Sequence, residues 1–272
     1  MKEKIDLDSI TSEHTGLKGL YERLLRRFKL IMHIATMIPV YLFAVIVLGT
    51  CLIPGISVFR MIGDLTLLQP VWIQNVTYGM SFALGYFLYG ISLVFLAPAI
   101  NFLICSIVGN LKEWRGPYYS AESLKWFLHN GLTYLVRFTF LEFITPSPLA
   151  ILFYKMMGMK IGKGVQINTT WISDPSLISV GERATIGGSV TIVAHYGQGG
   201  LLVIAPVIIG AACTIGIKAT VMGGVVIGDG AKILPHSVLL PKTIVPAGET
   251  WAGVPAQKIE LKQIYSNYQK GS

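Results

Sequence analysis

From residue 161 onward, the chain places an aliphatic side chain at every sixth position. The pattern has a single-residue slip and one longer interruption, and its aliphatic positions are Ile161, Ile167, Val180, Ile186, Ile192, Val203, Ile209, Ile215, Val221, Ile227, Ile233, Leu239 and Val245. A period of six fits neither an α-helix nor alternation along a strand, but it fits three short strands per triangular turn of a parallel β-helix. The glycine that often follows the aliphatic residue suits either a positive φ or close approach of neighbouring backbone.

Each end of such a prism needs a cap, because unpaired strand edges invite aggregation. We expect residues 148–158 to cover the first coil and residues 256–268 to form a helix over the last. An ordinary antiparallel barrel would need hairpin turns and period-two alternation, and neither is evident.

Two long runs without Asp, Glu, Lys or Arg precede the repeat, at residues 30–53 and 76–109. As a helix, the first run would be about 36 Å long, enough to cross a hydrocarbon core of about 30 Å. Basic residues gather before the first run and after the second, at Lys18, Arg23, Arg26, Arg27, Lys29, Lys112 and Arg115. The positive-inside rule therefore places both chain ends in the cytoplasm and the connecting loop, 54–75, outside. We expect a multi-pass protein of a bacterial-type inner (cytoplasmic) membrane, with the β-helix on the cytoplasmic side.

Residues 121–145 have an amphipathic pattern rather than that of a third span. A narrow polar stripe recurs at helical spacing, comprising Glu122, Lys125, His129, Thr133 and Arg137. A helix lying in the membrane interface fits this pattern. The expected organisation is a cytoplasmic segment 1–29, a transmembrane region 30–120, interfacial and connecting helices 121–158, and the β-helix domain 159–272.

Composition and charge agree with this division. The chain is 53% hydrophobic and 13% charged, with a mean hydropathy of +0.61, which points to membrane segments beside a water-soluble part. The net charge of +8 is not gathered in one cluster, so no nucleic-acid partner is expected. The three cysteines form no CxxC pair, which argues against disulfides and zinc-ribbon sites.

Two stretches at the ends of the repeat, and the repeat between them, form a recognisable pattern. The entry is "KMMGMKIGKGVQI" at 155–167, and the close is "AGVPAQKI" at 252–259, with Gln257 before Lys258. Over about residues 150–262 the chain resembles the left-handed β-helix acyltransferases, the hexapeptide-repeat family. The membrane segment followed by a β-helix is also similar, more loosely, to the terminal region of some nonribosomal peptide synthetases.

The interruption separates Ile192 from Val203 by eleven positions instead of six, and it contains His195 in "VAHYGQGG". The resemblance implies that His195 is the general base, at the interface between two subunits of a homotrimer. An ordinary imidazole pKa near 6.5 leaves most of the side chain neutral and basic at pH 7. The segment "INTTWISDP" implies Asn168 as an acceptor contact and Asp174 as an orienter of the base. The alternative is that His195 is a solvated turn residue.

The resemblance also implies acetyl-CoA or another acyl-CoA as the donor, with no metal ion. It places Gly216 and Leu234 beside the pantetheine, and Lys242 and Lys258 near the phosphates. Lysine suits a phosphate as a point charge.

The function that these features favour is a membrane-anchored acyltransferase, most plausibly an O-acetyltransferase. Its acceptor would be a hydroxyl or amine of an amphiphilic or lipid-linked saccharide, polyol or peptide, held at the membrane lipid surface. Two other functions stay open. One is a non-catalytic trimeric scaffold, and the other is a γ-class carbonic anhydrase-like protein, which needs three histidines per metal where the prism offers His195 and His236.

Overall fold

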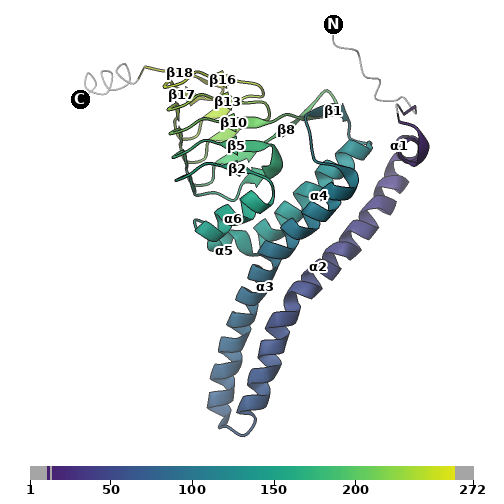
Figure 1. Ribbon diagram of the computed structural model, residues 1–272, viewed down its shortest axis with the longest axis vertical. Helices are drawn as coiled ribbons and strands as arrows, with labels where there is room; N and C mark the ends of the chain where they lie inside the picture. The colour runs from purple at the N-terminus through teal and green to yellow at the C-terminus, as the bar shows by residue number, and fades with distance from the viewer. Residues whose placement is uncertain (1–10, 13, 261–272) are drawn as a thin grey trace.

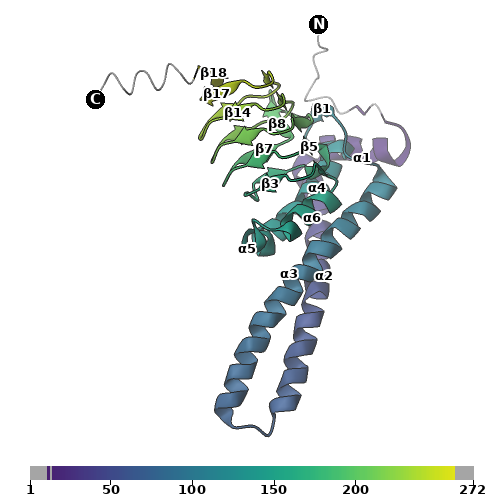
Figure 2. The same cartoon turned by 60° about the vertical axis from the view of Figure 1, so that its left-hand side comes forward.

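The chain forms a long helical hairpin with a triangular β-prism at one end of it (Figure 1). The computed structural model describes residues 11, 12 and 14–260. Helix α1 spans Gly16–Arg27, α2 spans Lys29–Thr66 and α3 spans Val71–Val108. Figure 2 shows α2 and α3 running side by side away from the prism.

Helices α2 and α3 are both long and apolar enough to cross a membrane. Each has 38 residues, so each is about 57 Å long, nearly twice a hydrocarbon core of about 30 Å. The expected loop over 54–75 is wrong in its length, because the helices are joined by residues 67–70 alone. Arg60 and Asp64 end the apolar run but not the helix, since charged residues are compatible with helical backbone.

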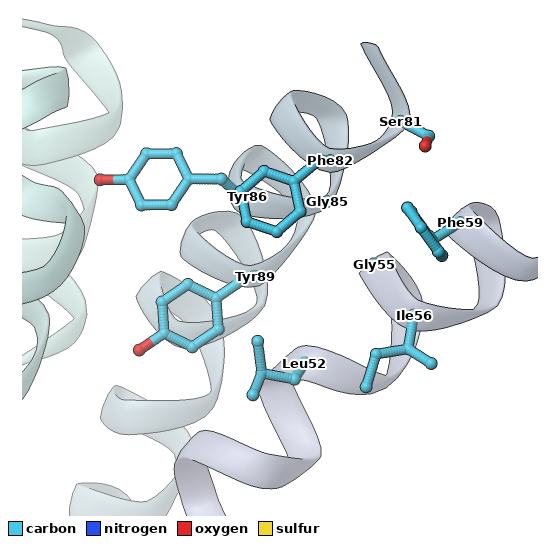
Figure 3. Close-up of a pocket in the computed structure, with 9 residues that line it drawn as sticks. All are labelled: Leu52, Gly55, Ile56, Phe59, Ser81, Phe82, Gly85, Tyr86 and Tyr89. Carbon is cyan, nitrogen blue, oxygen red and sulfur yellow. The ribbon is translucent and has the colours of Figure 1, made fainter. Parts of the chain in front are cut away.

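Glycine lets the two helices approach closely in their middle. A Cβ built on Gly55 would lie 2.9 Å from the backbone of Gly85. Beside this contact the helices leave an apolar cavity of about 450 Å³, with Phe59 and Tyr89 among its lining residues (Figure 3).

The segment between the hairpin and the prism contains strand β1 (Trp114–Pro117), helix α4 (Ala121–Val136), a π-helical turn (Arg137–Leu141), α5 (Glu142–Ile144) and α6 (Pro148–Met156). The polar stripe expected along 121–145 is present but faces protein. His129, Thr133 and Arg137 are all buried. Helix α6 lies under the first coil, as predicted for residues 148–158 (Figure 1).

The prism has three sheets, parallel except for the last strand of the second, which confirms the parallel β-helix predicted from the six-residue period. The first face contains β2 (Lys160–Ile161), β5 (Ile178–Val180), β10 (Val207–Ile209), β13 (Val226–Ile227) and β16 (Ile244–Val245). The second contains β3 (Gln166–Ile167), β6 (Thr185–Ile186), β11 (Thr214–Ile215), β14 (Lys232–Ile233), β17 (Thr250–Gly253) and β18 (Ala256–Lys258). The third contains β4 (Ile172–Ser173), β7 (Thr191–Val193), β12 (Thr220–Val221) and β15 (Val238–Leu239). The predicted aliphatic residues stack in register, for example Val180 on Ile209 and Ile209 on Ile227.

The glycine after the aliphatic residue serves close approach rather than a positive φ. A Cβ on Gly216 would lie 2.5 Å from the backbone nitrogen of Pro235 in the next coil. The left-handed corner falls two residues later, as at Lys218 with φ 58° and His236 with φ 60°. His236 therefore occupies an ordinary corner of the coil.

The interruption forms an ordered arm instead of a flexible loop. Strands β8 (His195–Gln198) and β9 (Leu201–Ile204) form an antiparallel hairpin, and β9 pairs with β1. The assignment of Val203 to a coil was wrong, because it lies in β9 and the coil resumes at β10. The run "LLVIAPVII" offers an aliphatic residue in either register, so pairing with β1 decides which part enters the prism.

The far end of the prism is closed by a hairpin. Strand β18 returns antiparallel to β17, pairing Trp251 with Lys258. The predicted helix over 256–268 is therefore wrong for 256–258, where the turn at Pro255 brings the chain back onto the sheet edge. The remainder, from 261 onward, lies outside the described residues.

Candidate active site

His195 is the first residue of β8, so it lies where the chain leaves the prism to form the arm. Its ring is 21% exposed, and its Nδ1 lies 2.6 Å from Oδ2 of Asp174. This contact places the imidazole proton on Nδ1, which leaves Nε2 as the basic nitrogen. The structure thus brings together the predicted base and its predicted orienter.

Asp174 is fully buried and sits in the left-handed region, with φ 61° and ψ 49°, just before the short 3₁₀ helix Pro175–Leu177. Its Oδ2 also accepts a hydrogen bond from the backbone N–H of Ala194 at 3.1 Å. A buried carboxylate needs such donors, because it has lost its water. This left-handed backbone is the corner conformation that Lys218 and His236 also adopt, so Asp174 occupies a corner of the coil, two residues after Ile172.

Helix α4 completes the support of this carboxylate with Asn130. The Asn130 side chain donates from Nδ2 to Oδ1 of Asp174 at 2.5 Å and accepts from the Asp174 backbone N–H at 3.1 Å. One turn earlier, the Trp126 ring packs edge-on against the His195 ring, with centroids 4.8 Å apart. The sequence reasoning missed both residues, and their spacing of one helical turn was the only signal that could have pointed to them.

Three further contacts of α4 connect the helical hairpin to the first coil. His129 Nδ1 lies 2.9 Å from Oδ1 of Asn101 in α3, and its Nε2 lies 3.3 Å from the Ser176 hydroxyl. Tyr134 and Ser173 share a hydroxyl–hydroxyl hydrogen bond of 2.7 Å. Burial lowers the pKa of His129, and the charge of nearby Asp174 opposes this only in part, so His129 is neutral at pH 7.

The other predicted site residues lie on the prism. Asn168 is exposed beside Gly188, and within the described ranges no hydrogen bond joins it to His195. Gly216 and Leu234 lie on neighbouring coils, where the backbone of Gly216 rests on the Leu234–Pro235 step.

The two predicted lysines differ in their surroundings. Lys242 is an exposed corner residue with φ 64°, and its stem packs over Gly224. Lys258 lies 2.7 Å from Glu249, and this contact raises the pKa of Lys258 and lowers that of Glu249. Across the residues that the structure describes, no three His, Cys, Asp or Glu side chains are grouped to hold a metal ion.

Parts of the chain are similar to known proteins. The model of the bacterial transferase hexapeptide family (six repeats) matches residues 206–241. The chain is 31% identical over 162 residues to YvoF of Bacillus subtilis (strain 168), an acetyltransferase by name, covering 56% of this chain and 92% of YvoF. It is 28% identical over 145 residues to the delta-poly-L-ornithine synthetase of Acinetobacter baumannii (strain AB307-0294), covering 53% of this chain but only 11% of the synthetase.

Two solved structures also show local similarity. One is a galactoside acetyltransferase in complex with coenzyme A, at 20% identity over 48% of this chain and 80% of that one, with a TM-score of 0.39. The other is the hexapeptide-repeat acetyltransferase VCA0836 of Vibrio cholerae O1 biovar eltor with acetyl coenzyme A. It shows 17% identity over 53% and 90% of the two chains, with a TM-score of 0.42.

Proposed function

The chain belongs to the hexapeptide-repeat acyltransferase family of left-handed β-helix proteins, and from this premise we propose that it moves an acyl group from acyl-CoA to a hydroxyl or amine of a membrane-associated acceptor. The observation that carries the proposal is the Asp174–His195 pair at the interruption of the coil.

The chemistry follows from which imidazole nitrogen is basic. Nε2 of His195 removes the proton as the acceptor oxygen or nitrogen attacks the thioester carbonyl. The new bond joins the acceptor to the acyl carbon, the carbon–sulfur bond breaks, and the proton passes to the departing CoA thiolate. The buried Asp174 carboxylate stabilises the imidazolium that forms in between.

The donor would lie along the prism, on the surface that includes Gly216 and Leu234, with Lys242 and Lys258 toward its phosphates. Lys258 would exchange its pairing with Glu249 for a phosphate. We propose a homotrimer, because a groove between neighbouring prisms would enclose both donor and acceptor. A detergent-solubilised protein that is monomeric and fully active would contradict the trimer.

The helical hairpin is the observation that favours a membrane-associated acceptor. If α2 and α3 cross the membrane, the enzyme and an amphiphilic acceptor share one surface, which raises the local concentration of the acceptor. The turn at 67–70 would then lie outside and the prism inside. Gln69→Cys should react with an impermeant maleimide in intact cells, and Ser272→Cys should not; the reverse pattern would contradict this topology.

The decisive test replaces His195. His195→Ala should lower the rate of acyl transfer by about 10²–10⁴-fold, the usual contribution of a general base. Acetyl-CoA binding, measured by calorimetry, should be unchanged, because the residues proposed to bind the donor lie on later coils of the prism. His236→Ala is the matched control, since His236 is an exposed corner residue of the same prism. Unaltered turnover in His195→Ala would refute the assignment, and a wild-type protein that binds no CoA thioester would favour a scaffold.

A further inference from the structure

A groove runs between α2 and α4 from Trp126, whose ring packs on the candidate base, into the apolar part of the helical hairpin. It consists of two adjoining cavities, of about 160 and about 310 Å³, which share Phe127 as a wall. Helix α3 packs against both α2 and α4 and leaves the space between those two open. We name this feature the α2–α4 groove.

The smaller cavity of the α2–α4 groove adjoins the active site. Trp126 lines it and is also the residue whose ring packs on His195. Tyr118 also lines this cavity, and its hydroxyl lies next to Gly197 in β8. A Cβ built on Gly197 would lie 3.1 Å from the Tyr118 hydroxyl oxygen. This end of the groove therefore reaches the strand that carries the base.

The two ends of the groove differ in polarity. Of the eleven residues that line the smaller cavity, five are apolar or tryptophan and six bear a hydroxyl group, namely Tyr21, Thr36, Tyr118, Tyr119, Ser120 and Ser123. The larger cavity is lined mainly by aliphatic and aromatic side chains, including Val40, Phe43, Ala44, Leu128 and Leu135. Its α2 residues belong to a helix that is apolar enough to span a membrane. A ligand that matches both ends has a polar head at His195 and an apolar tail directed into the membrane.

We propose that the α2–α4 groove holds the hydrocarbon chain of the acceptor, so that the substrate is an amphiphile with a linear tail and a hydroxyl- or amine-bearing head. This inference rests on the proposed acyl transfer at His195. The larger cavity, at 310 Å³, is within the range of about 300–1,000 Å³ that ligand pockets occupy.

Gly131 provides a direct way to fill the groove. It lines the larger cavity, and a Cβ built on it meets no atom within 4 Å. Gly131→Leu should therefore occupy the groove without disturbing α4, where leucine is also the better helix former. Gly79 in α3 is the matched control, because it is an exposed helical glycine with the same open surroundings and lines neither cavity of the groove.

The first measurement does not depend on activity. A dodecyl β-glucoside carrying a diazirine at the end of its chain is photolysed with the protein in lipid nanodiscs, and the labelled peptides are mapped by mass spectrometry. Labelling should concentrate on the α2 and α4 residues of the groove and fall at least fivefold in Gly131→Leu but not in Gly79→Leu. Uniform labelling of the hairpin, or labelling of the cavity in Figure 3 instead, with no response to Gly131→Leu, would overturn the proposal.

The second measurement is acyl transfer to alkyl glucosides of increasing chain length. Each methylene buried in the groove should raise kcat/KM by about fourfold. Gly131→Leu should lose this gain while retaining wild-type transfer to methyl glucoside. Identical chain-length dependence in wild type and Gly131→Leu would also overturn the groove assignment. If photolabelling is specific but the wild type acylates no glucoside, the groove stands and glucosides are not its acceptors. Loss of acetyl-CoA binding would be the separate failure of the proposed function.

Discussion

Replacing Asn130 by alanine tests whether α4 holds the candidate base in place. The substitution removes the donor to Asp174 Oδ1 and leaves the Asp174 N–H without its acceptor. Because Asp174 is fully buried, water does not substitute for the lost partner. A hydrogen bond to a charged group is worth about 1.5–3 kcal/mol, so full transmission of that loss to the transition state would lower kcat by about 10- to 150-fold.

The assay separates positioning from general damage. In Asn130→Ala, kcat should fall while the calorimetric affinity for acetyl-CoA is unchanged, since the proposed donor surface lies on later coils of the prism. Thr133→Ala is the matched control, because Thr133 is equally buried one turn along α4 and loses only a hydrogen bond to the His129 carbonyl. Wild-type kcat in Asn130→Ala, or an equal loss of kcat in Thr133→Ala, would refute the reasoning.

Two predictions concern the docking of the helical segment. Gly90 in α3 faces the Phe140 ring with no room for a Cβ, so Gly90→Val should lower the free energy of unfolding by about 1–3 kcal/mol. Gly79→Val is the control and should not lower it, and thermal midpoints measured in nanodiscs check both expectations. Burial lowers the pKa of His129, so below about pH 6.5 the unfolded chain binds a proton at His129 more readily than the folded chain does. The free energy of unfolding should therefore fall as the pH drops from 7 to 5.5. His129→Gln should reduce that fall, and an unchanged pH dependence of the melting temperature would contradict the prediction.

The sequence by itself determined the prism and, on either side of the interruption, its register. A dry, close-packed interior accepts only aliphatic side chains at the inward positions, and this requirement recurs with every face of the coil. The stacking of Ile209 on Ile227, one coil of eighteen residues later, could therefore be predicted from the period alone. His195 was conspicuous for the same reason, because it lies where the period stops, and the family resemblance pointed to Asp174.

The tertiary structure alone decided what surrounds those two residues. Asn130 meets Asp174 across 44 positions of chain, and its helix showed only an amphipathic pattern, which does not say what the polar stripe touches. Three residues of the stripe, His129, Thr133 and Arg137, turned out to be buried against the protein. Likewise Val203 fitted the six-residue period, but its strand pairs with β1, from a segment some ninety positions earlier. Periodicity reports which side chains avoid water, whereas the partner of each polar group depends on distant segments that only the folded chain brings together.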